Sequence, residues 1–144
     1  MSLHILIVDD SMLIRQVVKK VVRQAGLDVA GFLEAANGQE ALDILMKTPV
    51  DLVLSDINMP GMDGIEMLMR LRQIERLQEL PVIMVTTEGS EERINEAMDL
   101  GASGYVLKPF TPERLVEQLG PLGLLCKRED GVEPPPDFSD PTAF

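Results

Sequence analysis

Polar side chains with the chemistry to bind a cation or accept a group follow four short apolar runs of the sequence. Asp9 and Asp10 come directly after the run 4–8, and Asp56, followed by Asn58, comes just after 52–54. Runs of this kind are typical of buried strands, and the carboxyl ends of parallel strands meet at one edge of a sheet. The other polar groups in this position are Thr86, Thr87 and Glu88 after the run 82–85, and Lys108 after 105–107.

Three of these residues are carboxylates, and their convergence would be unfavourable without compensation. Asp9, Asp10 and Asp56 would repel one another, and a buried unpaired charge is costly. Either some of them are protonated or a cation neutralises them. An oxygen-only set suits a hard ion such as Mg²⁺, whereas zinc fits poorly because no His or Cys is near in the sequence.

A cation and an ammonium group on either side of one carboxylate would favour phosphoryl transfer to it. Asp56 is expected on the middle strand, and aspartyl phosphate is a recognised covalent intermediate. Lys108 and the cation would stabilise the charge on the transferring group, and the Thr86 hydroxyl would donate to a phosphoryl oxygen.

Each of these residues, taken alone, also has a simpler explanation. Asp9, Asp10 and Asp56 are ordinary turn or cap residues, Lys108 an ordinary surface residue, and Thr86 an ordinary core hydroxyl. Their joint placement after four different apolar runs favours a shared site.

The elements that must position this site alternate regularly along the chain. Strand-like apolar runs are predicted at 4–8, 29–33, 52–54, 82–85 and 105–107, each followed by a stretch of helical period. This alternation predicts an α/β fold with a parallel sheet and right-handed crossovers. The economical arrangement is a flavodoxin-like, doubly wound sheet of five strands in the order 2-1-3-4-5, with five helices.

Apolar stripes and end signals predict the five helices. The first is expected to begin after Ser11 and end near Gly26, and the fifth to begin with Thr111 as cap and Pro112 at the first helical position. The predicted buried stripes are Leu13, Ile14, Val17, Val18, Val21 and Val22; Ala41, Leu42, Leu45 and Met46; Ile65, Leu68, Leu71 and Ile74; Ile94, Ala97 and Met98; and Leu115, Val116 and Leu119.

Composition restricts the classes of partner. The formal net charge is −11, and no basic run longer than Lys127-Arg128 offsets it, so direct nucleic-acid binding is not expected. No apolar run approaches the roughly 20 residues of a membrane span, and the N-terminal run is too short for a signal sequence. With a single cysteine, Cys126, and hence no internal disulfide, the chain is expected to be cytoplasmic.

The chain is predicted to form one domain over residues 1–121 and a C-terminal tail over 122–144. The tail is acidic, contains three consecutive prolines and lacks periodicity, which is typical of a disordered segment or a linker. A docking peptide that uses Phe138 and Phe144 is the alternative.

Four segments of the sequence resemble the receiver domains of two-component response regulators. They are residues 7–11 (IVDDS), 55–64 (SDINMPGMDG), 85–87 (VTT) and 104–110 (GYVLKPF), and residues 34–38 (EAANG) match the usual link that follows the second strand. The resemblance covers roughly residues 3–120. It is closest to the single-domain chemotaxis type because Asn58 and Glu88 stand at the two variable positions of the active site.

The resemblance implies a role for each site residue. Asp56 would be the phosphoacceptor, Asp10 would ligate Mg²⁺ directly and Asp9 through water, and Asp56 and the backbone carbonyl of Asn58 would complete the protein ligands. Thr86 and Tyr105 would form a coupled switch pair, Lys108 would contact the phosphoryl group, and the bond from Lys108 to Pro109 would be cis. Asn58, Thr87 and Glu88 would tune phosphoryl access; Thr87 stands where the family most often has Ala or Gly, which predicts slower phosphorylation by small donors.

The resemblance also implies a signalling protein rather than a conventional enzyme. It would catalyse only its own phosphorylation, by a histidine kinase or phosphotransfer protein, and its own dephosphorylation. The face formed by the fourth helix, fifth strand and fifth helix would then repack for an unknown downstream protein, with the chain a monomer or a phosphorylation-dependent dimer.

Three alternatives remain open from the sequence. A Mg²⁺-dependent phosphatase with an aspartyl nucleophile would need an acid two residues after Asp56, where Asn58 stands instead. A pseudo-receiver that never takes phosphate is disfavoured by the intact set of Asp, Thr and Lys. The third alternative is that the chain is the receiver part of a longer regulator, with the tail as the start of a linker.

Overall fold

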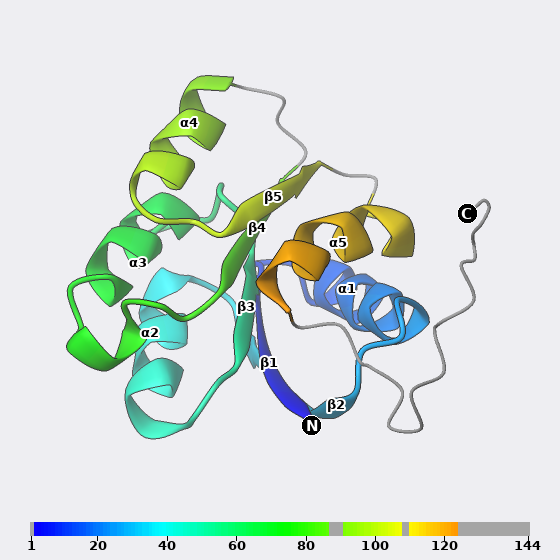
Figure 1. Cartoon of the computed structure of the whole chain (residues 1–144). Coiled ribbons are helices and arrows are strands. Elements are labelled where there is room, and N and C mark those ends of the chain that lie inside the picture. Colours follow the sequence, from blue (N-terminus) through cyan, green and yellow to red (C-terminus); the bar gives the residue numbers. More distant parts are fainter. Residues whose placement is uncertain (1, 87–90, 108–109, 124–144) are drawn as a thin grey trace.

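A five-stranded parallel sheet forms the centre of the protein (Figure 1). The computed structural model describes residues 2–86, 91–107 and 110–123. The strands are β1 (Leu3–Val8), β2 (Val29–Ala35), β3 (Leu52–Ser55), β4 (Val82–Thr86) and β5 (Gly104–Leu107). Their order is β2-β1-β3-β4-β5, which confirms the predicted fold, and each predicted strand lies within two residues of the observed one.

Helices cover both faces of the sheet (Figure 1). They are α1 (Met12–Gln24), α2 (Gly38–Lys47), α3 (Gly64–Leu71), α4 (Glu91–Asp99) and α5 (Pro112–Leu119), with short 3₁₀ turns η1 (Glu75–Leu77) and η2 (Gly120–Leu122). The helices α1 and α5 lie on one face, and α2, α3 and α4 lie on the other. In the part of the chain that the structure describes, no helix is both long and apolar enough to cross a lipid bilayer.

The two faces of the sheet belong to two separate cores. Along β1, Ile5 and Ile7 join the core beneath α1 and α5, whereas Leu6 and Val8 join the core beneath α2 and α3. Successive side chains of a strand point to opposite faces, so a strand covered on both sides is apolar throughout. This is why the strands appear in the sequence as continuous apolar runs.

Four helices begin at a residue whose side chain caps the first turn. Ser11, Asn37, Asp63 and Thr111 each accept a hydrogen bond from the backbone N–H three residues later. Such caps satisfy one of the otherwise unpaired N–H groups of the helix. Ser11 and Thr111 were predicted as caps from the sequence, and Asn37 and Asp63 were not.

Several predicted core positions are wrong. Leu13 is 73% exposed, and Val17, Met46 and Met98 are also exposed. The buried stripe of α1 is the narrower set Val18, Val21 and Val22, because a helix lying on a sheet buries only the side that faces it. The third helix ends at Leu71, so Ile74 lies in the turn before η1 and packs on the core from there.

Candidate functional site

The predicted carboxylates lie together at the carboxyl edge of the sheet. Val8 is paired with Ser55 in the β1–β3 ladder, so the residues that follow, Asp9 and Asp56, leave the sheet at the same level. Backbone hydrogen bonds continue this pairing, because the Asp56 N–H donates to the Val8 carbonyl at 2.9 Å. One carboxylate oxygen from each of Asp9, Asp10 and Asp56 lies within 4.8 Å of the others.

The burial of the three carboxylates is graded. Asp9 is only 4% exposed, Asp56 is half-buried and Asp10 is exposed, so the cluster opens toward solvent at Asp10. A hard divalent cation fits this set, because all three groups are carboxylates and solvent can supply further oxygen ligands on the open side.

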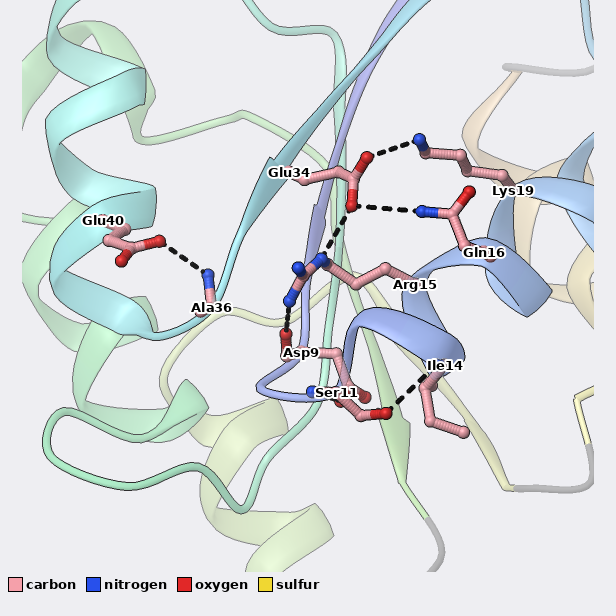
Figure 2. Close-up of polar contacts among 9 residues, drawn as sticks. All are labelled: Asp9, Ser11, Ile14, Arg15, Gln16, Lys19, Glu34, Ala36 and Glu40. Atoms are coloured by element: carbon pink, nitrogen blue, oxygen red, sulfur yellow. Dashed lines mark hydrogen bonds and ion pairs between the residues drawn. The ribbon is translucent and has the colours of Figure 1, made fainter.

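The turn that carries Asp9 and Asp10 is fixed by hydrogen bonds on several sides (Figure 2). The Asp9 N–H donates to the Ala35 carbonyl at 3.0 Å, which ties the turn to the end of β2. The Asp9 Oδ1 accepts from the Ser11 N–H at 2.9 Å, and the Asp9 carbonyl accepts from Arg15 Nη1 at 2.6 Å. Asp9 is therefore held through both its backbone and its side chain.

Arg15 connects this turn to Glu34 on β2 (Figure 2). Its Nε donates to Glu34 Oε1 at 2.7 Å, and the same carboxylate pairs with Lys19 and accepts a longer bond of 3.4 Å from Gln16. Hydrogen bonds from Lys19 and then Arg15 lower the pKa of the Glu34 carboxyl below its usual 4.5, although partial burial opposes the change. Glu34 is therefore an anion stabilised by three side chains of α1.

Asp56 is held by the turn that follows β3. Its Oδ1 accepts from the Ile57 N–H at 2.7 Å and from the Asn58 N–H at 3.4 Å, and its backbone carbonyl accepts from Ser55 Oγ at 2.9 Å. The chain then folds back toward the end of β3, where the Gly64 N–H donates to the Ile57 carbonyl at 2.9 Å. The loop between β3 and α3 thus closes on the backbone of Ile57, the residue next to Asp56.

Thr86 and Tyr105 lie on neighbouring strands and project from the same face of the sheet. Met84 is paired with Tyr105 in the β4–β5 ladder, and Thr86 is two residues further along β4. Because paired residues and alternate residues share a face, both side chains lie on the side covered by α3 and α4. Thr86 is 0% exposed and Tyr105 is 39% exposed.

Four residues of the predicted site lie outside the described part of the chain. They are Thr87, Glu88, Lys108 and Pro109, so the predicted lysine contact, the cis bond and the proposed influence of Thr87 stay predictions.

The structure also shows residues around the site that the sequence analysis missed. Asp63 caps α3 and pairs with Arg93 of α4 at 3.1 Å, and Arg15 and Glu34 support the Asp9 turn. Asp63 could have been found, because an Asp directly before a helical stripe is an N-cap signal. The pairing of Arg15 with Glu34 had no local signal, because the two residues meet only through the packing of α1 on β2.

Comparison with known proteins gives consistent matches over the described domain. Residues 5–120 match the family described as response regulator receiver domain. The chain is 44% identical to chemotaxis protein CheY-3 of Vibrio cholerae over 118 residues, which is 82% of this chain and 89% of that protein. It is 43% identical to chemotaxis protein CheY of Pseudomonas aeruginosa, with 81% of this chain and 93% of that protein covered.

Solved structures give the same result for the fold. The chemotaxis response regulator CheY4 of Vibrio cholerae matches with a TM-score of 0.74 at 37% identity, over 85% of this chain and 99% of that chain. A response regulator receiver domain protein, CheY-like, from Methanospirillum hungatei matches with a TM-score of 0.73 at 30% identity, over 85% and 94% of the two chains.

Proposed function

The chain belongs to the response regulator receiver domain family, and from this we propose that it accepts a phosphoryl group on Asp56 in a Mg²⁺-dependent reaction. It is a signalling protein of the CheY type. The donor in this proposal is the phosphohistidine of a histidine kinase or phosphotransfer protein. The phosphorylated form is then read by a downstream protein, and the reaction takes place in the cytoplasm.

The meeting of Asp9, Asp10 and Asp56 at one sheet edge is the observation that carries the proposal. Three carboxylates within 4.8 Å repel one another, and a divalent cation offsets that repulsion. Asp56 directly follows β3, the central strand, and its half-buried carboxylate is fixed by the Ile57 N–H yet remains open to a donor.

The chain's own residues supply positioning and charge. In the transfer, a carboxylate oxygen of Asp56 bonds to phosphorus, the phosphorus–nitrogen bond of the donor breaks, and the released imidazole takes up a proton. Asp9, Asp10, Asp56 and the Asn58 carbonyl would hold Mg²⁺, whose charge would stabilise the phosphoryl oxygens. We assign Lys108 the same task from the opposite side, and Asn58, Thr87 and Glu88 the control of access.

Thr86 and Tyr105 supply the conformational response in this proposal. The buried Thr86 hydroxyl turns toward the phosphoryl group, and the partly exposed Tyr105, on the same face, moves inward. Tyr105 also lines an open groove of about 490 Å³ along β5 and α5, together with Thr111, Arg114 and Gln118. A change at Tyr105 would therefore alter a surface available to a partner.

Phosphorylation with a small donor tests the proposal. Incubation with acetyl phosphate and Mg²⁺, followed by intact-protein mass spectrometry, should show one phosphoryl group on the wild-type chain and none on Asp56→Asn. Asp43→Asn is the matched control, because Asp43 is an exposed carboxylate on α2 outside the cluster, and it should be labelled like the wild type. Equal labelling of Asp56→Asn and wild type, or labelling of the wild type when EDTA removes Mg²⁺ before the donor is added, would contradict the proposal.

The phosphorylated form is also expected to lose its phosphoryl group without a partner. We propose that the same cation site assists attack of water on the aspartyl phosphate, so hydrolysis should slow when Mg²⁺ is removed after labelling. The time course of the labelled mass, with and without EDTA, measures this. A rate that is the same in both conditions would contradict self-catalysed dephosphorylation.

A further inference from the structure

We propose that Arg15 is a positioning residue for the cation site: its guanidinium, braced by Glu34, holds the peptide between Asp9 and Asp10 in the orientation that binds a divalent cation. The inference rests on the proposed function, which makes that cation Mg²⁺.

The contacts of Arg15 place it between the turn and the sheet. The Arg15 side chain is only 13% exposed, and its guanidinium donates through Nη1 to the Asp9 carbonyl at 2.6 Å and through Nε to Glu34 Oε1 at 2.7 Å. One planar group thus joins the residue that follows β1 to the carboxyl end of the adjacent strand β2, from its own position on α1 (Figure 2). A lysine has a single ammonium and lacks the planar fork that reaches two acceptors in fixed directions.

The hydrogen bond from Arg15 affects the cation site because its acceptor is the backbone carbonyl of Asp9. The Asp9 carbonyl belongs to the planar peptide unit whose other end is the N–H and Cα of Asp10. Fixing the direction of this carbonyl therefore fixes where Asp10 leaves the turn. Asp10 is the exposed member of the carboxylate cluster, so burial does little to hold its side chain in place.

Glu34 braces Arg15 because its carboxylate is itself held from several sides. Lys19 and Gln16 of α1 donate to it in addition to Arg15, and it is 30% exposed. A carboxylate with three donors has little freedom to rotate. The position of the guanidinium is consequently set by β2 and α1 together.

The direction in which Mg²⁺ affinity changes when Arg15 is replaced distinguishes a positioning role from a purely electrostatic one. A cation near three carboxylates opposes the binding of a second cation, so a purely electrostatic Arg15 weakens Mg²⁺ binding and its removal strengthens it. A positioning Arg15 has the opposite effect, because its loss frees the turn. Glu34 lies beside the guanidinium and offsets part of its charge, although it also pairs with Lys19, so the direction of the measured change in Mg²⁺ affinity decides between the two roles.

The experiment measures Mg²⁺ affinity directly, without any phosphoryl donor. Titration of ¹⁵N-labelled protein with MgCl₂, followed through the amide signals of Asp10 and Asn58, gives the Kd for the wild type, Arg15→Met, Arg15→Lys and Glu34→Gln. We expect Kd to rise about tenfold for both Arg15 variants and less for Glu34→Gln. Arg70→Met is the matched control, since Arg70 pairs with Glu66 on α3 outside this network, and its Kd should equal that of the wild type.

Each other outcome overturns the inference in a recognisable way. Tighter binding by Arg15→Met with unchanged binding by Arg15→Lys means that Arg15 acts through its charge. An unchanged Kd in all variants means that the turn containing Asp9 and Asp10 keeps its conformation without Arg15 and Glu34. A wild-type chain that does not bind Mg²⁺ overturns the proposed function as well, whereas normal wild-type binding with unaffected variants overturns only the role of Arg15.

Two further measurements exclude a general loss of structure. Circular dichroism melts show whether each variant is folded; if Arg15→Met is not, Arg15→Lys and Glu34→Gln still decide the question. At saturating Mg²⁺ the labelling rate of the folded variants with acetyl phosphate should return to within about twofold of the wild type, since the defect lies in cation affinity. A rate that stays low at saturating Mg²⁺ overturns the assignment.

Discussion

The backbone carbonyl of Asp56 occupies the space that a side chain at position 64 would need. A Cβ atom on Gly64 would lie 2.1 Å from the Asp56 carbonyl oxygen and 2.9 Å from the terminal methyl carbon of Met84. Gly64 is the first residue of α3, and its N–H also donates to the Ile57 carbonyl. The start of α3 therefore packs directly on the backbone of the candidate phosphoacceptor.

Gly64→Ala is expected to destabilise the protein and disturb the site together. Alanine normally favours a helix over glycine by about 1 kcal/mol, yet here the added methyl group must displace backbone, which costs about 1–3 kcal/mol or more. Urea unfolding should show the loss, and acetyl phosphate labelling of Asp56 should slow. Gly31→Ala is the control, because nothing lies within 4 Å of a Cβ at that position. A Gly64→Ala protein as stable as the wild type would show that the contact relaxes without cost.

Asp63 is expected to stabilise the protein more as a helix cap than as an ion pair. Its Oδ1 accepts from the Glu66 N–H at 2.9 Å, and its Oδ2 pairs with Arg93 at 3.1 Å across the α3–α4 boundary. Asp63→Ala removes both contacts and should cost about 1–2 kcal/mol, whereas Asp63→Asn keeps a capping oxygen and should cost less than about 1 kcal/mol. Urea unfolding of both variants measures the difference.

Arg93→Gln provides the check on that comparison. It leaves the cap in place and removes the charge of the partner, so its loss of stability should match that of Asp63→Asn. If Asp63→Asn and Asp63→Ala are equally destabilised, the ion pair and not the cap stabilises this boundary.

The fold was largely predictable because strands that are buried on both faces of the sheet appear in the sequence as continuous apolar runs. β1 is apolar at every position except the exposed His4, and helix ends carry Ser11, Thr111 and Pro112, so the alternation and the sheet order could be predicted. The meeting of Asp9, Asp10 and Asp56 followed from the same reasoning, since strand ends in a parallel sheet share an edge.

What could not be predicted depends on packing between elements. Periodicity alone placed Leu13 and Val17 in the core because it records which residues are apolar, not how much of a helix the sheet covers. The Arg15–Glu34 pair joins residues 19 positions apart, and the closeness of Gly64 to Asp56 depends on the path of a loop. Neither relationship has a spacing that a local pattern can reveal.

The exposed side of α1 leads to a direct comparison of two apolar substitutions. Leu13→Gln should change the free energy of unfolding by less than about 0.5 kcal/mol, since the side chain already lies in solvent. Val18→Ala, on the buried side of the same helix, should cost about 2 kcal/mol through lost burial and the cavity left behind. Urea denaturation of the two variants tests the observed stripe against the wider predicted one; a large loss for Leu13→Gln would favour the latter.

Glu34 should make the stability of the protein depend on pH in the acid range. Hydrogen bonds from Lys19 and Arg15 lower the pKa of Glu34 in the folded chain below the 4.5 expected when the chain is unfolded. Above about pH 4.5 the ionised carboxylate therefore stabilises the fold, and this contribution is lost as the pH falls through the lowered folded value. Glu34→Gln lacks the ionisable group, so the free-energy difference between wild type and variant isolates the contribution.

That difference is expected to be about 1 kcal/mol near pH 7, because the pair is only partly shielded from solvent, and to shrink steadily below pH 4.5. Urea unfolding of both proteins at intervals from about pH 7 to about pH 3 measures it. Glu66→Gln is the control, since Glu66 and Arg70 form an exposed pair on α3 that should contribute less than about 0.5 kcal/mol near pH 7. If the free-energy difference between wild type and Glu34→Gln stays constant or grows toward acid pH, the carboxylate is not stabilised by its partners on α1. That result would also contradict the proposal that Glu34 holds Arg15 in place.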